Sequence, residues 1–290
     1  MEGSADNLWG QIASGLAGRS PAVVATIVRD SGSVPRRTGA KMLIHPDRST
    51  DGTVGGGIFE LLVIRDALAA LKEQKSVTQS YSFTPKGVSH DSFGAVCGGR
   101  AEVFLEVVMP ADRLLIVGGG HCGKALAQAA SHLDFSIVVA DDREEFSRAE
   151  DFPFPNVEAV VHAGGGFERL PEPDALTYVA LVSKGFQTDE AALRRVIHSP
   201  AAYIGMMGSL NKREFVYDRL RADGITEAAL ARVHSPIGMN IDAQTPEEIA
   251  ISILGQIIQV RAARRAIGPK ESEVAEHKSS VDTASESNVH

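Results

Sequence analysis

A chain of 290 residues, 43% of them apolar, is long enough to bury a substantial core and is more typical of two domains than of one. Its formal net charge of −8 at pH 7 gives no basic field that would attract nucleic acid or an anionic membrane, so we expect neither as a partner. The start of the chain lacks a signal-peptide pattern, no segment reads as a membrane span, and two cysteines are too few for a disulfide framework, which together predict a cytoplasmic protein.

The first part of the chain predicts a small α+β domain. Runs of apolar and β-branched residues predict strands at 22–29, 41–45 and 101–108. Between the second and the third of these runs, apolar side chains recur at helical spacing and predict a helix over 58–75. A proline and charged residues at 109–113 then interrupt the pattern, so we place the end of this domain at residue 110.

The second part of the chain predicts a larger domain, residues 111–268. Short apolar runs alternate here with helical patterns, and the runs lie at 114–117, 136–140, 178–182 and 202–204. Such alternation is typical of βαβ units with a mostly parallel sheet. The sequence therefore predicts the α/β fold class, with a C-terminal Rossmann-like parallel-sheet domain and a smaller N-terminal α+β domain.

The last predicted helix has clear limits at both ends. Thr245 and Glu248 have the spacing of a capping box, and Pro246 suits the first helical position. Gly268 follows the helix and favours its termination. Residues 269–290 are rich in acids, Ser and Thr, and poor in large apolar groups, so we expect a disordered tail.

A glycine fingerprint opens the second domain. Gly118, Gly120 and Gly123 lie between a predicted buried strand and a predicted helix, the context in which G-x-G-x-x-G holds the pyrophosphate of a dinucleotide. Asp141 ends the next strand, 23 residues after Gly118, where a carboxylate can accept a ribose hydroxyl. His121 lies inside the phosphate loop and either contacts the ligand or caps the loop by hydrogen bonding.

The first domain has a second group of candidate site residues. The glycine run before the predicted helix, which includes Gly55, Gly56 and Gly57, either presents backbone N–H groups to an anion or forms a flexible turn. Glu60 can complement the helix dipole or pair with the amine edge of a pterin or guanine, and Arg36 can clamp a phosphate. Cys97, in a glycine-flanked loop, is a candidate for metal or sulfur chemistry, or else a small buried apolar group.

The order of these motifs resembles the XdhC/CoxI-like accessory factors of xanthine dehydrogenase and related molybdenum hydroxylases, over most of residues 8–265. The matching segments are Gly32-Ser33-x-Pro35-Arg36-x-x-Gly39-Ala40-x-Met42, Gly52-Thr53-Val54-Gly55-Gly56-Gly57-x-x-Glu60, Cys97-Gly98-Gly99, Gly118-Gly119-Gly120-His121-x-Gly123, Asp141-Asp142-Arg143, Tyr203-Ile204-Gly205-x-x-Gly208-Ser209-x-x-Lys212, Pro236-Ile237-Gly238 and Thr245-Pro246-Glu247-Glu248-Ile249-Ala250.

The resemblance implies a maturation chaperone rather than a catalyst. Such a protein binds the molybdenum cofactor, as molybdopterin or its dinucleotide, protects it during sulfuration and inserts it into an apo molybdenum hydroxylase. A cysteine desulfurase is the other expected partner, and we expect a homodimer. Cys97 would then contact the metal or carry sulfur, and Lys212 would join the cofactor-binding residues.

Two other functions remain open from the sequence. An NAD(P)-dependent oxidoreductase would have a similar fold but needs a positioned acid or base, for which His121, Lys184 and Lys212 are the candidates. A redox or nucleotide sensor would use the thiols of Cys97 and Cys122. The ligand that accompanies the purified protein distinguishes these functions.

Overall fold

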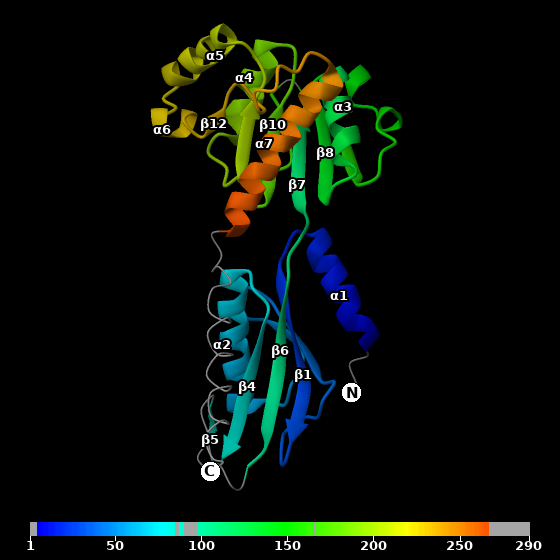
Figure 1. The fold of residues 1–290 in the computed structure, drawn as a ribbon, viewed down its shortest axis with the longest axis vertical. Helices are drawn as coiled ribbons and strands as arrows, with labels where there is room; N and C mark the ends of the chain where they lie inside the picture. Colours follow the sequence, from blue (N-terminus) through cyan, green and yellow to red (C-terminus); the bar gives the residue numbers. More distant parts are fainter. Residues whose placement is uncertain (1–4, 85–86, 90–97, 165, 267–290) are drawn as a thin grey trace, which may run out of the picture.

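The computed structural model consists of two domains that follow one another along the long axis of the molecule (Figure 1). It describes residues 5–84, 87–89, 98–164 and 166–266. The expected tail at 269–290 and the candidate Cys97 lie outside the described residues. No helix within the described part of the chain is long and apolar enough to cross a membrane.

The N-terminal domain is an antiparallel sheet with a helix on each face. Its elements are α1 (Ala5–Ala17), β1 (Ala22–Ser31), β2 (Lys41–Ile44), β3 (Thr50–Gly52), α2 (Gly57–Glu73), β4 (Val77–Thr84), β5 (Gly87–Ser89) and β6 (Arg100–Val108), with strand order β3-β2-β1-β6-β4-β5. Alternate residues of β1 point to opposite faces. Val23 and Ala25 pack into the core with Phe59 of α2, whereas Val24 packs with Leu8 of α1.

The C-terminal domain is a parallel sheet between two helical layers. Its elements are β7 (Asp112–Val117), α3 (His121–Ala130), β8 (Phe135–Asp141), η1 (Glu144–Phe146), η2 (Ala149–Asp151), β9 (Val157–His162), β10 (Thr177–Leu181), α4 (Phe186–Val196), β11 (Tyr203–Met206), α5 (Leu210–Ala222), α6 (Glu227–Leu230), β12 (Val233–His234) and α7 (Pro246–Ala266). α3 and α7 share a core with one face of the sheet, and α4 and α5 share a core with the other.

The strand order of this sheet decides where a ligand can bind. The order β12-β11-β10-β7-β8-β9, counted from β9, is the Rossmann order 3-2-1-4-5-6. The chain adds β8 and β9 on one side of β7. It then crosses back and adds β10, β11 and β12 on the other side of β7. The crevice at the carboxyl ends of β7 and β10 is therefore the topological switch point, where open α/β sheets bind their ligands.

Ionic contacts fix the junction between the domains. β6 leads into β7 through three residues, 109–111. Arg19, which follows α1, donates from Nε to Asp174 Oδ2 at 2.5 Å and from Nη1 to the carbonyl of Ala111 at 3.1 Å. Within the second domain, close to this junction, the buried carboxylate of Asp112 accepts bonds of 3.0 Å from Arg264 and Arg265 at the end of α7.

The structure confirms the predicted fold class and the start of the last helix, while the expected stop at Gly268 lies outside the described residues. Glu248 accepts a bond from Thr245 N at 2.9 Å, and Glu248 N donates to Thr245 Oγ1 at 3.2 Å, as the capping box requires. The sequence did not predict α1 or α5. In α5, only Val216, Tyr217 and Leu220 are buried among many charged residues, so the apolar periodicity is weak.

The contact between Arg19 and Asp174 predicts an acid-dependent stability. Burial alone would raise the pKa of Asp174, but hydrogen bonds from Arg19 and Thr177 outweigh it and lower this pKa to about 2. A carboxyl whose pKa falls on folding stabilises the native state above its unfolded pKa and loses that effect as the pH falls through the folded pKa. We expect Asp174→Asn to lower the melting temperature at pH 7, and this deficit to shrink between about pH 4 and about pH 2.

The control for this experiment is Asp134→Asn, a change at an exposed carboxylate in the turn after α3. Thermal melts of the wild type and both variants over this range measure the effect. A deficit of Asp174→Asn that is constant with pH would contradict the assigned role of the ion pair.

Candidate dinucleotide-binding site

The fingerprint loop joins β7 to α3 at the switch point, and packing requires two of the three fingerprint glycines, Gly118 and Gly123. Gly118 has φ of 115°, and a Cβ there would lie 2.9 Å from the backbone N of Ser183. A Cβ on Gly123 would lie 1.8 Å from the carbonyl oxygen of Gly118. These two glycines therefore let α3 start directly against the strand end.

Gly120 has a different environment. A Cβ built on it meets nothing within 4 Å, so the space next to its backbone is open. Gly120 is also the N-cap of α3, and no side chain of the described residues caps this helix. The N–H groups of the first turn and the positive end of the helix dipole are thus free to meet an anion. His121 is exposed at the first position of the helix.

Asp141, predicted to bind a ribose, is bonded within the chain. Its Oδ2 accepts from Gly119 N at 2.8 Å, and its Oδ1 accepts from the backbone N and the Nε of Arg143, both at 2.9 Å. Burial raises the pKa of Asp141, but these hydrogen bonds outweigh it and the pKa lies below its ordinary value. The side chain is fully buried, so a ribose can reach the carboxylate only if Arg143 moves. The ribose contact stays a prediction.

Lys212 lies beside the fingerprint in an ionic network. Its Nζ is 2.5 Å from Asp189 Oδ2 and donates to the carbonyls of Ser183 and Met207, each at 3.3 Å. Asp189 is fully buried, and burial raises its pKa despite bonds from Lys212 and Ser183. Lys212 thereby ties the ends of β10 and β11 together. Its predicted contact with a cofactor remains untested.

In the first domain, Glu60 binds its own loop. Its Oε2 accepts from Thr53 Oγ1 at 2.6 Å and from Gly56 N at 3.1 Å, so it caps the N-terminus of α2. Gly55 packs against Pro35, since a Cβ there would lie 2.5 Å from the proline Cβ. Around Gly56 and Gly57 the space is open, and Arg36 is exposed.

The two glycine groups, before α2 and after β7, lie toward opposite ends of the molecule (Figure 1). Gly99 packs against Ser33 at the start of β6, and Gly118 follows the end of β7. The nine residues of β6 and the six of β7 run in nearly the same direction, and at ~3.3 Å per residue they span about 50 Å. The structure therefore does not bring the predicted site residues of the two domains together within one chain.

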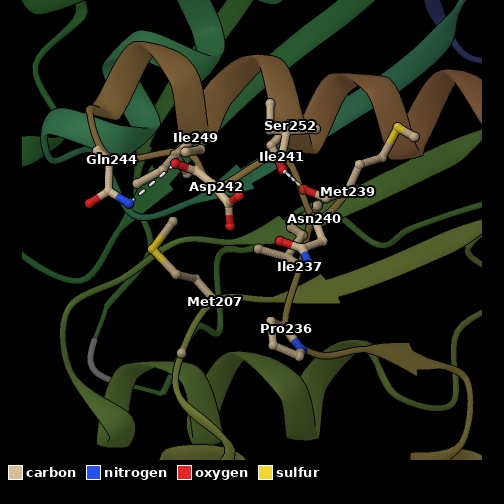
Figure 2. A pocket seen from close by; sticks show the side chains of 13 residues that line it. Met207, Pro236, Ile237, Met239, Asn240, Ile241, Asp242, Gln244, Ile249 and Ser252 are labelled. Carbon is tan, nitrogen blue, oxygen red and sulfur yellow. Dashed lines mark hydrogen bonds between the residues drawn. The ribbon is translucent and has the colours of Figure 1, made fainter.

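A cleft that the sequence did not predict lies at the carboxyl end of β11 (Figure 2). It has a volume of about 720 Å³ and lies between the loop after β11, the loop after β12 and the first turns of α7. Met207, Ile237 and Ile249 form apolar wall, while Asp242 and Asn240 add polar groups. The Pro236-Ile237-Gly238 segment was the available signal, but its role could not be deduced without the fold.

Cys122 is half-buried between α3 and α7. Its pKa is raised, first by burial and then by the charge of Glu247. A raised pKa lowers the thiolate fraction, which makes this thiol a poor nucleophile or soft-metal ligand.

Gly120 has open space beside its backbone and Gly123 has none, so substitutions at these two positions test the packing of the loop. We expect Gly123→Ala to cost about 2 kcal/mol or more of stability, because the added carbon overlaps the Gly118 carbonyl. Gly120→Val should cost no more than about 1 kcal/mol, since only the N-cap preference changes. Urea unfolding measures both values. Equal losses of stability would contradict the overlap at Gly123 and the open space at Gly120.

Comparisons with known proteins agree with this architecture. A model of the XdhC Rossmann domain matches residues 114–257, and a model of the XdhC and CoxI family matches residues 16–82. The uncharacterized protein YqeB of Escherichia coli strain K12 is 39% identical over 245 residues, which are 83% of this chain and 44% of YqeB. A Bacillus subtilis strain 168 protein described as a probable xanthine dehydrogenase component is 26% identical over 164 residues, which are 55% of this chain and 46% of that protein.

The chain thus spans about half the length of the curated relatives it matches. A crystal structure described as a xanthine dehydrogenase from Bacillus halodurans is 24% identical, with a TM-score of 0.48, and the match covers 90% of this chain and 97% of that one. The two family models lie in the two domains and include both glycine groups. Together with the Rossmann order of the second sheet, they show that the chain belongs to the XdhC and CoxI family.

Proposed function

We propose that this protein binds the molybdenum cofactor, as molybdopterin or its dinucleotide, protects it during sulfuration and delivers it to a xanthine dehydrogenase-type molybdenum hydroxylase. Members of its family are accessory-type proteins of xanthine dehydrogenase, associated with maturation of this cofactor. The steps of binding, protection and delivery are the proposal.

The observation that carries the proposal is the open approach to Gly120. At Gly118 and Gly123, neighbouring backbone atoms fill the space that a side chain would need. The space beside Gly120 is open and admits a ligand group next to the uncapped start of α3. This combination fits a phosphate or pyrophosphate, which molybdopterin and its dinucleotide both supply. The backbone N–H groups at the start of α3 would hold that group, and the cofactor itself would supply the metal and its redox chemistry.

An NAD(P)-dependent oxidoreductase is the second candidate, and the Rossmann strand order favours it equally. Hydride transfer needs an acid or base that is free to exchange a proton. Lys212 is held by Asp189 and two carbonyl groups and is not free for that task, whereas His121 and Lys184 are exposed and keep this candidate open.

The separation of the two glycine groups supports the proposed homodimer. Gly98 and Gly99 directly follow Cys97 in sequence and lie at the far end of the first domain from Gly118. If Cys97 acts on a cofactor held at the Gly118 loop, a second copy of the chain can provide one of the two without breaking the contacts of Arg19 between the domains. The cysteine desulfurase and the apo hydroxylase are the other proposed partners.

The ligand carried by the purified protein tests the proposed function. From cells that make the cofactor, we expect the wild type to retain molybdenum and a pterin, and Gly120→Val to retain little, since its side chain fills the open space. Gly10→Val is the matched control, because Gly10 on α1 also has no neighbour within 4 Å of a built Cβ. Elemental analysis and pterin fluorescence measure retention. A nicotinamide nucleotide in place of the pterin would instead establish the oxidoreductase.

Cys97 gives a second test, with Cys122 as its matched control. Serine is a poor soft ligand and forms no persulfide, so we expect Cys97→Ser to fold normally but to lose molybdenum and the ability to activate an apo hydroxylase. Cys122→Ser should lose little of either. Co-expression of Cys97→Ser with Gly120→Val should partly restore retention if the two sites come from different copies. Full retention by folded Cys97→Ser alone would eliminate a direct role of this thiol.

A further inference from the structure

The cleft between β11 and α7 lies at the same edge of the sheet as the fingerprint, and Ser183 and Lys212 connect the two. Gly118 packs against Ser183, and Lys212 bonds to the carbonyls of both Ser183 and Met207. Met207 is part of the cleft wall. β11 is two strands from β7 in the sheet, which at ~4.8 Å per strand puts their ends about 10 Å apart. A ligand anchored at the Gly118 loop can therefore extend into the cleft.

The size and the walls of the cleft suit a flat ring. Its volume of about 720 Å³ lies within the range of ~300–1,000 Å³ found for small-molecule sites. Met207, Ile237 and Ile249 supply apolar surface, on which a planar heteroaromatic ring can pack.

One carboxylate in the cleft has no partner in the described part of the chain. Figure 2 shows the side chain of Asp242 directed into the space between α7 and Met207. Gln244 donates to the backbone carbonyl of Asp242 and not to its carboxylate. The φ of Asp242 is 55°, so the loop holds this residue in the left-handed conformation, which aspartate and asparagine adopt more readily than most residues. The carboxylate is a bidentate acceptor placed at the edge of an apolar wall.

We propose that this cleft binds the 2-amino-4-oxopyrimidine edge of a pterin or guanine ring, with Asp242 accepting hydrogen bonds from the ring N–H and the 2-amino group. The inference rests on the proposed function, since molybdopterin and its guanine dinucleotide both contain this edge. A carboxylate matches two adjacent N–H donors with two charge-assisted bonds.

Glu60, the residue for which the sequence suggested this pairing, has its Oε2 occupied by Thr53 and Gly56 and lies in the other domain. The cleft thus assigns the amine-recognising role to a different carboxylate. Asp242 lies in the loop between β12 and α7, at the carboxyl edge of the parallel sheet, whereas Glu60 begins α2 of the antiparallel domain.

Paired probes isolate the 2-amino group. Pterin and lumazine differ at position 2, where an amine is replaced by an oxo group, and guanosine and xanthosine monophosphates differ in the same way. We expect the full-length wild type, titrated calorimetrically, to bind pterin about tenfold or more tightly than lumazine, because lumazine loses one bond and turns an oxygen toward the carboxylate. The nucleotide pair shows whether a guanine takes the same position.

Asp242→Asn should reduce this preference to less than about twofold, and asparagine suits the left-handed backbone, so the variant should fold. Asp134→Asn, at an exposed carboxylate after α3, should keep the preference intact. A preference in either probe pair that depends on Asp242 supports the proposal and identifies the ring. Equal binding within both pairs, no saturable binding of any probe, or a preference that survives Asp242→Asn would overturn it.

Failure here is distinct from failure of the proposed function. Retained molybdenum and pterin without a preference that depends on Asp242 would remove the cleft from the site and leave the chaperone function in place. A preference without retained molybdenum or pterin would keep the cleft as a ring site and remove the chaperone function.

Discussion

The close approach of Gly123 to the carbonyl of Gly118 sets the geometry of the candidate site. A side chain at Gly123 would overlap that oxygen, so α3 can begin directly against the end of β7 only because the residue is glycine. The approach aims the first N–H groups of α3 into the crevice at the switch point. Gly120 then needs no side chain for packing, and the space that it leaves open is the part of the loop that a ligand can occupy.

A second constraint acts along the length of the molecule. β6 and β7 follow one another almost without interruption, and the contacts of Arg19 with Asp174 and with the carbonyl of Ala111 join the two domains. The far end of the first domain is therefore kept away from the crevice (Figure 1). A process that uses both ends has to bring in a second molecule or break the contacts of Arg19.

Local signals were sufficient to predict the main frame of the fold from the sequence. The buried strands β7 and β8 are continuous apolar runs, and α7 carries its capping box, so periodicity and end signals agree. Elements with few buried side chains, such as α5 and the edge strand β9, lack a strong pattern and were not predicted. Such elements take their structure mainly from tertiary packing.

The candidate site was harder to predict because a residue type does not reveal its partner. Glu60, Asp141 and Lys212 each had the right chemistry for a ligand, yet each is bonded to the chain itself. Asp242 carries no motif, and its position over the cleft depends on the path of the loop between β12 and α7. Long-range contacts of this kind appear only once the strands are placed beside one another.

Two carboxylates of the crevice differ in their hydrogen bonding. Under the proposed function, the bonded one fixes the shape of the crevice and the other selects the ligand. Asp141 receives bonds from Gly119 and Arg143, which stabilises the phosphate loop before any ligand arrives. The carboxylate of Asp242 accepts no bond from the described residues, is exposed to solvent and lies next to apolar surface. A ligand that covers this surface removes the carboxylate from solvent, so it must replace the lost hydrogen bonds or be rejected. Under the proposed function, discrimination between ligands that share a phosphate would fall to Asp242 and the cleft that it lines.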